Sequence, residues 1–179
     1  MRVKIILIRL MLFMLISMTA CSYEESKRNR ENVESTPLEH EKIDELTVGE
    51  DFQDLNKDIE SPYKVHPDNT YFSEYRNYDQ YWNEDLMLAV ERESGEVLSI
   101  LMLENNRVSK VLSGLKIGDS IDEITNFYGK SYYDFKDREQ AIYIYGYVDH
   151  DNGLELAFIH NQKWITGISL SLYDKLEWK

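Results

Sequence analysis

The chain has 179 residues, and its 33 acidic residues outnumber its 20 basic residues, which gives a formal net charge of −13. This surplus of negative charge argues against nucleic acid and against anionic lipid surfaces as partners, because both attract basic proteins.

The first 20 residues have the three parts of a secretory leader. They hold three basic residues and no acidic one, an unbroken apolar run at 10–16, and mostly small residues at 17–20. The apolar run is too short to span a bilayer, which takes about 20 apolar residues. The pattern predicts a signal peptide at 1–20.

The tetrapeptide Met18-Thr19-Ala20-Cys21 resembles the lipobox of bacterial lipoproteins. In that family the leader is removed before the cysteine, and the cysteine sulfur carries a diacylglyceryl group with fatty acyl chains such as palmitate. The resemblance implies that Cys21 is lipidated and holds the protein at the extracytoplasmic face of the cell membrane. Cys21 is the only cysteine, so no internal disulfide is expected. An ordinary signal peptide followed by a free thiol, or an uncleaved anchor helix, would be the simpler alternatives.

Residues 21–45, which follow the leader, are mostly charged and polar and show no helical or alternating apolar period. We expect a flexible acidic tether there, with a reach on the order of 25–30 Å. Residues 21–179 hold 33 acidic and 17 basic residues, a net charge of −16, which favours a domain that stays soluble and off the membrane surface.

An internal repeat begins after the tether. Residues 46–55 match 115–124 without a gap at an offset of 69, and residues 86–90 match 154–158 at an offset of 68. Residues 97–100 match 165–168 at the second offset. The sequence therefore predicts two duplicated units, at 46–114 and at 115–179.

Each unit is predicted to consist of a helix followed by three strands. The helices begin after Asp51 and Ser120, which are suitable N-cap residues, and the second ends at Gly129. Apolar residues at helical spacing mark their buried faces: Phe52, Leu55 and Ile59, then Ile121, Ile124 and Tyr128. The strands are expected at about 70–78, 85–90 and 97–103, and at about 141–147, 154–159 and 164–172. The fold class is α+β, with two tandem αβββ repeats and helices on one face of antiparallel sheet.

The second unit also carries a family resemblance. Gly114-Leu115-Lys116-Ile117-Gly118-Asp119-Ser120, a helix and then Tyr128-Gly129-Lys130 resemble small secreted domains of the SmpA/OmlA and β-lactamase-inhibitor-protein type. Similar units occur in Gram-positive lipoproteins. The resemblance implies the fold and says little about function, because the shared residues are those of turns and helix caps.

The sequence offers little that would support catalysis or metal binding. Asp149-His150-Asp151 has metal-ligand residue types, and His160 could lie on the neighbouring strand, but Asp151-Asn152-Gly153 is also a typical hairpin turn. No nucleophile motif or phosphate-binding loop is present. We predict a turn here, no metal, no cofactor and no enzyme activity.

Aromatic residues are the more informative set. Seven of them lie in corresponding spans of the two units, four in the first and three in the second: Tyr71, Tyr75, Tyr78, Trp82, Tyr143, Tyr145 and Tyr147. They could form one exposed aromatic face of the sheet, because tyrosine brings a large contact area and a polar tip. They could equally be ordinary cross-strand pairs.

The function predicted from the sequence is a membrane-anchored, non-catalytic binding module that grips a protein or cell-wall component with this aromatic face. The alternative is a structural accessory lipoprotein of cell-envelope assembly, as the SmpA/OmlA resemblance implies.

Overall fold

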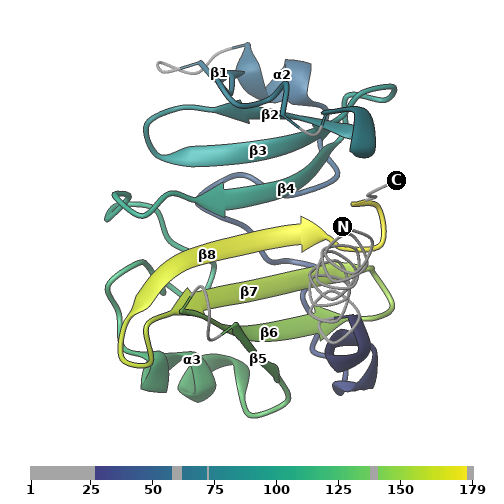
Figure 1. Cartoon of the computed structure of the whole chain (residues 1–179). Coiled ribbons are helices and arrows are strands. Elements are labelled where there is room, and N and C mark those ends of the chain that lie inside the picture. Colours follow the sequence, from purple (N-terminus) through teal and green to yellow (C-terminus); the bar gives the residue numbers. More distant parts are fainter. Residues whose placement is uncertain (1–26, 58–61, 72, 138–140, 177–179) are drawn as a thin grey trace, which may run out of the picture.

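The computed structural model describes residues 27–57, 62–71, 73–137 and 141–176. Within them, eight strands form one antiparallel sheet in the order β1-β2-β3-β4-β8-β7-β6-β5 (Figure 1). The first half of the sheet contains β1 (Lys64–Val65), β2 (Tyr78–Trp82), β3 (Leu86–Glu91) and β4 (Val97–Met102), and the second half contains β5 (Tyr133–Asp137), β6 (Ile142–Asp149), β7 (Leu154–His160) and β8 (Ile165–Leu172). Helices α2 (Phe52–Asn56) and α3 (Ile121–Tyr128) precede the two halves. The α+β class is confirmed.

The two halves meet where β4 pairs with β8, with Ile100 opposite Leu170, so they share one continuous sheet. Each half has four strands instead of the expected three. The additional strands, β1 and β5, lie at the two edges of the sheet. The hydrophobic pattern did not reveal them because β1 has only two residues, both exposed, and β5 carries charged residues between its aromatic ones.

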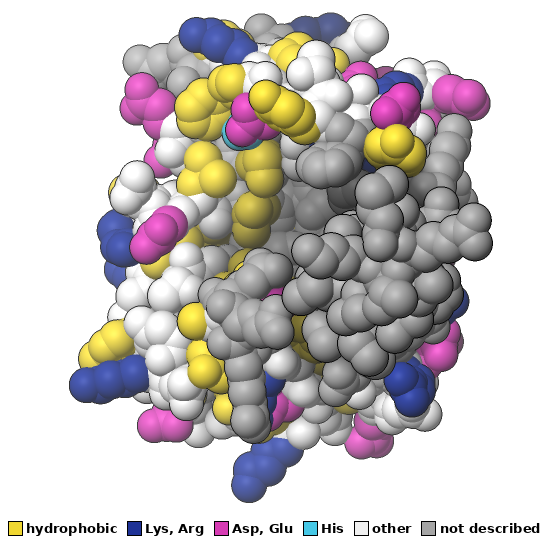
Figure 2. Space-filling view, in the orientation of Figure 1, with side chains coloured by type: hydrophobic (Ala, Val, Ile, Leu, Met, Phe, Trp, Pro, Cys, Tyr) yellow, Lys and Arg dark blue, Asp and Glu magenta, His cyan; other side chains and the backbone are white. Residues whose placement is uncertain are grey.

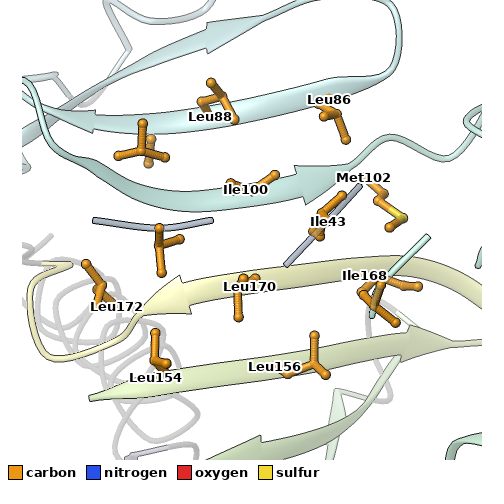
Figure 3. Packing of buried hydrophobic residues seen from close by; sticks show 14 of the residues in the cluster. Ile43, Leu86, Leu88, Ile100, Met102, Leu154, Leu156, Ile168, Leu170 and Leu172 are labelled. Atoms are coloured by element: carbon orange, nitrogen blue, oxygen red, sulfur yellow. The ribbon is translucent and has the colours of Figure 1, made fainter. Parts of the chain in front are cut away.

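One face of the sheet carries the hydrophobic core. Because side chains alternate between the two faces of a strand, every second residue of β3, β4, β7 and β8 points to this side. Figure 3 shows how these side chains from the four central strands lie in register across the junction of the halves, with Ile43 packed over them. We call this side the core face and the opposite side the open face.

Helices α2 and α3 both pack on the core face. The Phe52 ring of α2 lies 4.3 Å from the ring of Tyr81, and Ile124 of α3 is fully buried in the core. The expected caps are confirmed, since Asp51 and Ser120 each accept a hydrogen bond from a backbone N–H of the first turn. Ile59, expected on the buried side of the first helix, lies outside the described residues.

The strand expected at 70–78 is wrong. Residues before Tyr78 form a turn and a short 3-10 helix (Ser73–Tyr75), and β2 begins only at Tyr78. The reason is the side chain of Arg92, which donates hydrogen bonds to the backbone carbonyls of Ser73, Arg76 and Tyr78. These bonds hold the segment in a folded connection that cannot extend the sheet.

The flexible tether expected up to residue 45 is also wrong over much of its length. Residues 27–32 are helical, and Leu38 and Ile43 are buried in the core. Glu41 is buried too, and its carboxylate accepts hydrogen bonds from the Leu112 N–H at 2.8 Å and the Tyr128 hydroxyl at 2.9 Å. The composition of this stretch indicates an unstructured chain. Its few apolar residues nevertheless lie over the core and hold the segment in place. We call residues 27–46 the N-terminal arm.

Candidate binding face

The three tyrosines of β6 do not face solvent together. Tyr143, Tyr145 and Tyr147 lie opposite His160, Phe158 and Leu156 of β7, which places them on the core face. Tyr147 is 0% exposed, and its hydroxyl donates a hydrogen bond to the Gly129 carbonyl at 2.8 Å. Tyr145 instead packs against Tyr132, with their ring centroids 4.3 Å apart. These residues therefore form part of an aromatic cluster beside α3.

The aromatic residues expected from the first unit are placed differently. Tyr78 and Trp82 pair with Glu91 and Met87 of β3 and lie on the open face. Tyr71 and Tyr75 belong to the connection before β2, where they are 65% and 48% exposed. The single aromatic face expected from the sequence is therefore not formed, because Tyr78 and Trp82 point to one side of the sheet and the β6 tyrosines point to the other.

The open face holds a hollow of about 350 Å³ that lies across the junction of the two halves. Its floor consists of small side chains on the four central strands: Ala89, Ser99, Ala157, Ser169 and Ser171. Larger and mostly apolar side chains border it: Tyr78, Gln80, Met87, Leu101, Ile144 and Ile159. Figure 2 looks onto this side of the molecule, where hydrophobic side chains form a band over the sheet.

A charged group closes one end of the hollow. Glu155 of β7 points to the open face but is only 6% exposed. Its carboxylate lies 3.0 Å from the guanidinium of Arg30 in the N-terminal arm, and it accepts a hydrogen bond from the Tyr133 hydroxyl. The Arg30 guanidinium also lies 5.1 Å from the centre of the Tyr173 ring.

Gly146 makes this arrangement sterically feasible. It lies opposite Tyr133 in the β5–β6 pair, and a Cβ atom at this position would collide with the Tyr133 ring. The ring can therefore lie across the sheet and bring its hydroxyl to Glu155. Burial and the adjacent carboxylate raise the pKa of Tyr133 far above its usual value, so the phenol keeps its proton and remains a hydrogen-bond donor. An isolated glycine in a strand that otherwise alternates tyrosines is the signal in the sequence that marks such a close approach.

The cluster Asp149-His150-Asp151 leads into the expected turn: Asp149 ends β6, and residues 150–153 form the turn before β7. The buried Asp149 carboxylate accepts hydrogen bonds from the backbone N–H groups of Leu38, Asp151 and Asn152. Burial by itself would raise the pKa of Asp149, but these hydrogen bonds to the charged form outweigh it and lower the pKa. Asp149 thus fixes the turn and attaches the N-terminal arm to it.

His160 lies at the far end of β7 from this turn and does not approach His150. Its Nδ1 accepts a hydrogen bond from the Gln162 N–H at 3.1 Å, and burial lowers the pKa of the ring. Among the described residues, no group of three or more His, Cys, Asp and Glu side chains is placed to hold a metal ion.

Cys21 lies outside the described residues. No helix within the described part of the chain is long and apolar enough to cross a membrane.

Comparison with known proteins gives no family assignment. No protein-family model matches the sequence, and no curated protein matches it. A crystal structure of a cysteine-rich secretory protein from Staphylococcus aureus shares 16% identity with this chain, with a TM-score of 0.44. The similarity covers 74% of this chain and 49% of that one, so this chain matches about half of the secretory protein. At this level of similarity the match carries no argument about fold or function.

Proposed function

We propose that the protein is an extracytoplasmic lipoprotein, anchored through Cys21, whose domain is a non-catalytic binding module for another protein. The observation that carries this proposal is the hollow of about 350 Å³ on the open face. A concave, mostly apolar depression with a few polar groups is the usual form of a binding site. The binding surface differs from the one expected from the sequence, since it is built from small and aliphatic residues with Tyr78 at its border.

The floor of the hollow suits the entry of side chains from a partner. Ser99, Ser169 and Ser171 offer hydroxyls that can donate or accept hydrogen bonds, and Ala89 and Ala157 leave space above the sheet. Met87 and Leu101 provide apolar walls, which favour burial of an apolar partner segment.

We also propose that the two halves are copies of one unit, a helix followed by four strands. Equivalent hydrogen bonds support this. The N–H of Gly49 donates to the carbonyl of Val97 at 2.8 Å, and the N–H of Gly118 donates to that of Ile165 at 2.9 Å. Phe52 and Ile121 are the first residues of α2 and α3. Their N–H groups likewise donate hydrogen bonds to the carbonyls of Gly95 and Lys163, in the turns before β4 and β8. The mirrored strand order is what two such copies would give when joined through their last strands.

The proposed binding site then lies where the copies join. The first half contributes Met87, Ala89 and Leu101 to its lining, and the second half contributes Glu155, Ala157 and Ile159. Duplication would have created this concavity, since a single unit would provide only one of its walls.

Site-specific photo-crosslinking in cells of the source organism tests the binding proposal. A photoreactive residue at Gln80, which borders the hollow, is expected to give one discrete protein adduct, whereas the same residue at Val108, which is 86% exposed on the connection between the halves, is not. Leu101→Glu should remove the adduct, because it places a charge in the apolar wall. Equal adducts from Gln80 and Val108, or none from either, would contradict the proposal. Adducts with many components of one large assembly would favour the accessory role in envelope assembly.

A further inference from the structure

The pairing of Arg30 with Glu155 joins two separate parts of the molecule. Arg30 belongs to the helical residues 27–32 of the N-terminal arm, which lie beside the β6–β7 end of the sheet (Figure 1). Glu155 belongs to β7, in the second half of the sheet. The guanidinium thus reaches the hollow from outside the sheet, whereas the groups that surround it belong to the sheet and to the turn after β8.

These surrounding groups are matched to a guanidinium. It lies 3.0 Å from the Glu155 carboxylate and 5.1 Å from the centre of the Tyr173 ring. A carboxylate and an aromatic ring together recognise a planar cation by hydrogen bonding and by cation–π attraction. The Tyr133 hydroxyl orients the carboxylate, and Gly146 leaves the space for the Tyr133 ring. The carboxylate, the phenol and the glycine all lie within strands, so the site is held by the sheet.

Arg30 fills this site incompletely. A guanidinium and a carboxylate pair best through two parallel hydrogen bonds. The contact described between Arg30 and Glu155 runs from Nη2 to Oε2 at 3.0 Å. Its Nε is buried and has no hydrogen-bond partner in the described part of the chain. A buried N–H without a partner is unfavourable, so an arginine that approached from another direction could pair better with the same carboxylate.

We propose that Glu155, Tyr133 and Tyr173 form a receptor site for the guanidinium of an arginine side chain from a partner protein, which Arg30 occupies in the free chain. This inference rests on the proposed binding function of the open face. The charge of the chain favours such a partner, because residues 21–179 carry −16 and attract basic protein surfaces. The hollow that continues from Glu155 would receive the apolar neighbours of the incoming arginine.

Arg30 then acts as a tethered competitor. A side chain held close to its site by the same chain has a local concentration on the order of millimolar or higher, which a partner must overcome. Removal of Arg30 is therefore expected to expose the site and to strengthen the binding of a free arginine derivative.

The test uses the full-length protein in detergent and the probe N-acetyl-arginine amide, followed by NMR shifts of the Gly146 and Ser171 backbone amides. Arg30→Ala should bind the probe at least tenfold more tightly than the wild type. Arg28→Ala is the matched control, since Arg28 is exposed in the same helical segment and its loss changes the net charge equally. It should bind like the wild type.

Two further comparisons make the test specific. The double variant Arg30→Ala, Glu155→Gln should lose the affinity for the arginine probe that Arg30→Ala gains. The Arg30→Ala variant should also bind the arginine probe at least tenfold more tightly than it binds the N-acetyl amides of lysine and of uncharged citrulline. Equal probe binding by Arg30→Ala and the wild type, no effect of Glu155→Gln, or equal binding of citrulline would overturn the inference. The crosslink from Gln80 separates this failure from failure of the proposed function: an unchanged adduct in the Arg30→Ala, Glu155→Gln double variant means that the open face binds its partner without a guanidinium.

Discussion

Replacement of Gly146 by alanine is expected to destabilise the domain, which is the reverse of the usual effect. Alanine in place of a strand glycine commonly stabilises by about 0.5–1 kcal/mol, because glycine loses more conformational freedom on folding. Gly146 lies inside β6, where its backbone conformation suits any residue. The added Cβ, however, would collide with the Tyr133 ring, which must move away from the sheet.

The size of the effect follows from what Tyr133 loses. Its hydrogen bond to the buried Glu155 carboxylate contributes about 1.5–3 kcal/mol, as for other hydrogen bonds to charged groups. Overpacking of a filled site adds about 1–3 kcal/mol. After the intrinsic gain from alanine is subtracted, we expect Gly146→Ala to lower the free energy of unfolding by about 3 kcal/mol.

Urea unfolding at 25 °C, followed by tryptophan fluorescence and circular dichroism, measures this free energy. In a Tyr133→Leu background, which keeps an apolar side chain but removes the ring atoms that approach Gly146, the same change should be neutral or stabilising by up to about 1 kcal/mol. The coupling between the two sites is then about 3 kcal/mol in a double-mutant cycle. Gly167→Ala is the control, since its nearest neighbour is the flexible end of Ile159 at 3.1 Å. A stable Gly146→Ala variant, or one equally destabilised in both backgrounds, would refute the reasoning.

Three other substitutions test different parts of the molecule. Ile124→Asp should abolish cooperative folding, because a charge in the core costs several kcal/mol. The control Phe127→Asp, on the exposed side of α3, should change stability by less than about 0.5 kcal/mol. Circular dichroism and gel filtration distinguish the two outcomes. Asp149→Asn should lose about 1.5–3 kcal/mol at pH 7. Folding lowers the pKa of Asp149, so its contribution to the free energy of unfolding is fully present above the pKa of the unfolded chain, about 3.9. This contribution is lost as the pH falls through the lower pKa of the folded protein. Urea unfolding of the variant and of the wild type should therefore give the same stability only in strong acid. Cys21→Ser should release the protein from membranes or leave it unprocessed, and a cleaved variant that still sediments with membranes would rule out the lipid anchor.

Local patterns were sufficient for much of the fold. The capping residues Asp51 and Ser120 predicted where the two helices begin, and the strands expected at about 85–90, 154–159 and 164–172 lie close to the observed bounds of β3, β7 and β8. The failures arose where contacts between distant residues decide the conformation. Arg92 folds a segment that resembles a strand, and the core covers Leu38 and Ile43, which the surrounding charges had hidden.

The candidate site was less accessible to sequence reasoning, because its location depends on which face each residue occupies. Tyr143, Tyr145 and Tyr147 alternate in the sequence as the residues of an exposed strand face would. Their partners on β7, however, lie on the core face, so the tyrosines lie there too. The floor of the hollow is formed by serine and alanine residues, which carry no pattern of their own. Only Gly146 within β6 gave a local indication of the close approach that builds the site.

Attachment of the N-terminal arm to the β6–β7 turn has a mechanical consequence if Cys21 is the lipid anchor. Arg30 pairs with Glu155, and the N–H groups of Thr36 and Leu38 donate hydrogen bonds to Val148 and Asp149, so the attached part of the arm begins by Arg30 and not after residue 45. Eight residues separate Cys21 from Arg30, and three of them are helical, which limits this connection to about 25 Å at full stretch. A pull from the bilayer would act on the sheet at the β6–β7 turn, so the domain would hang from that end with its strands pointing towards the lipid and the open face turned sideways, towards neighbouring proteins in the same membrane.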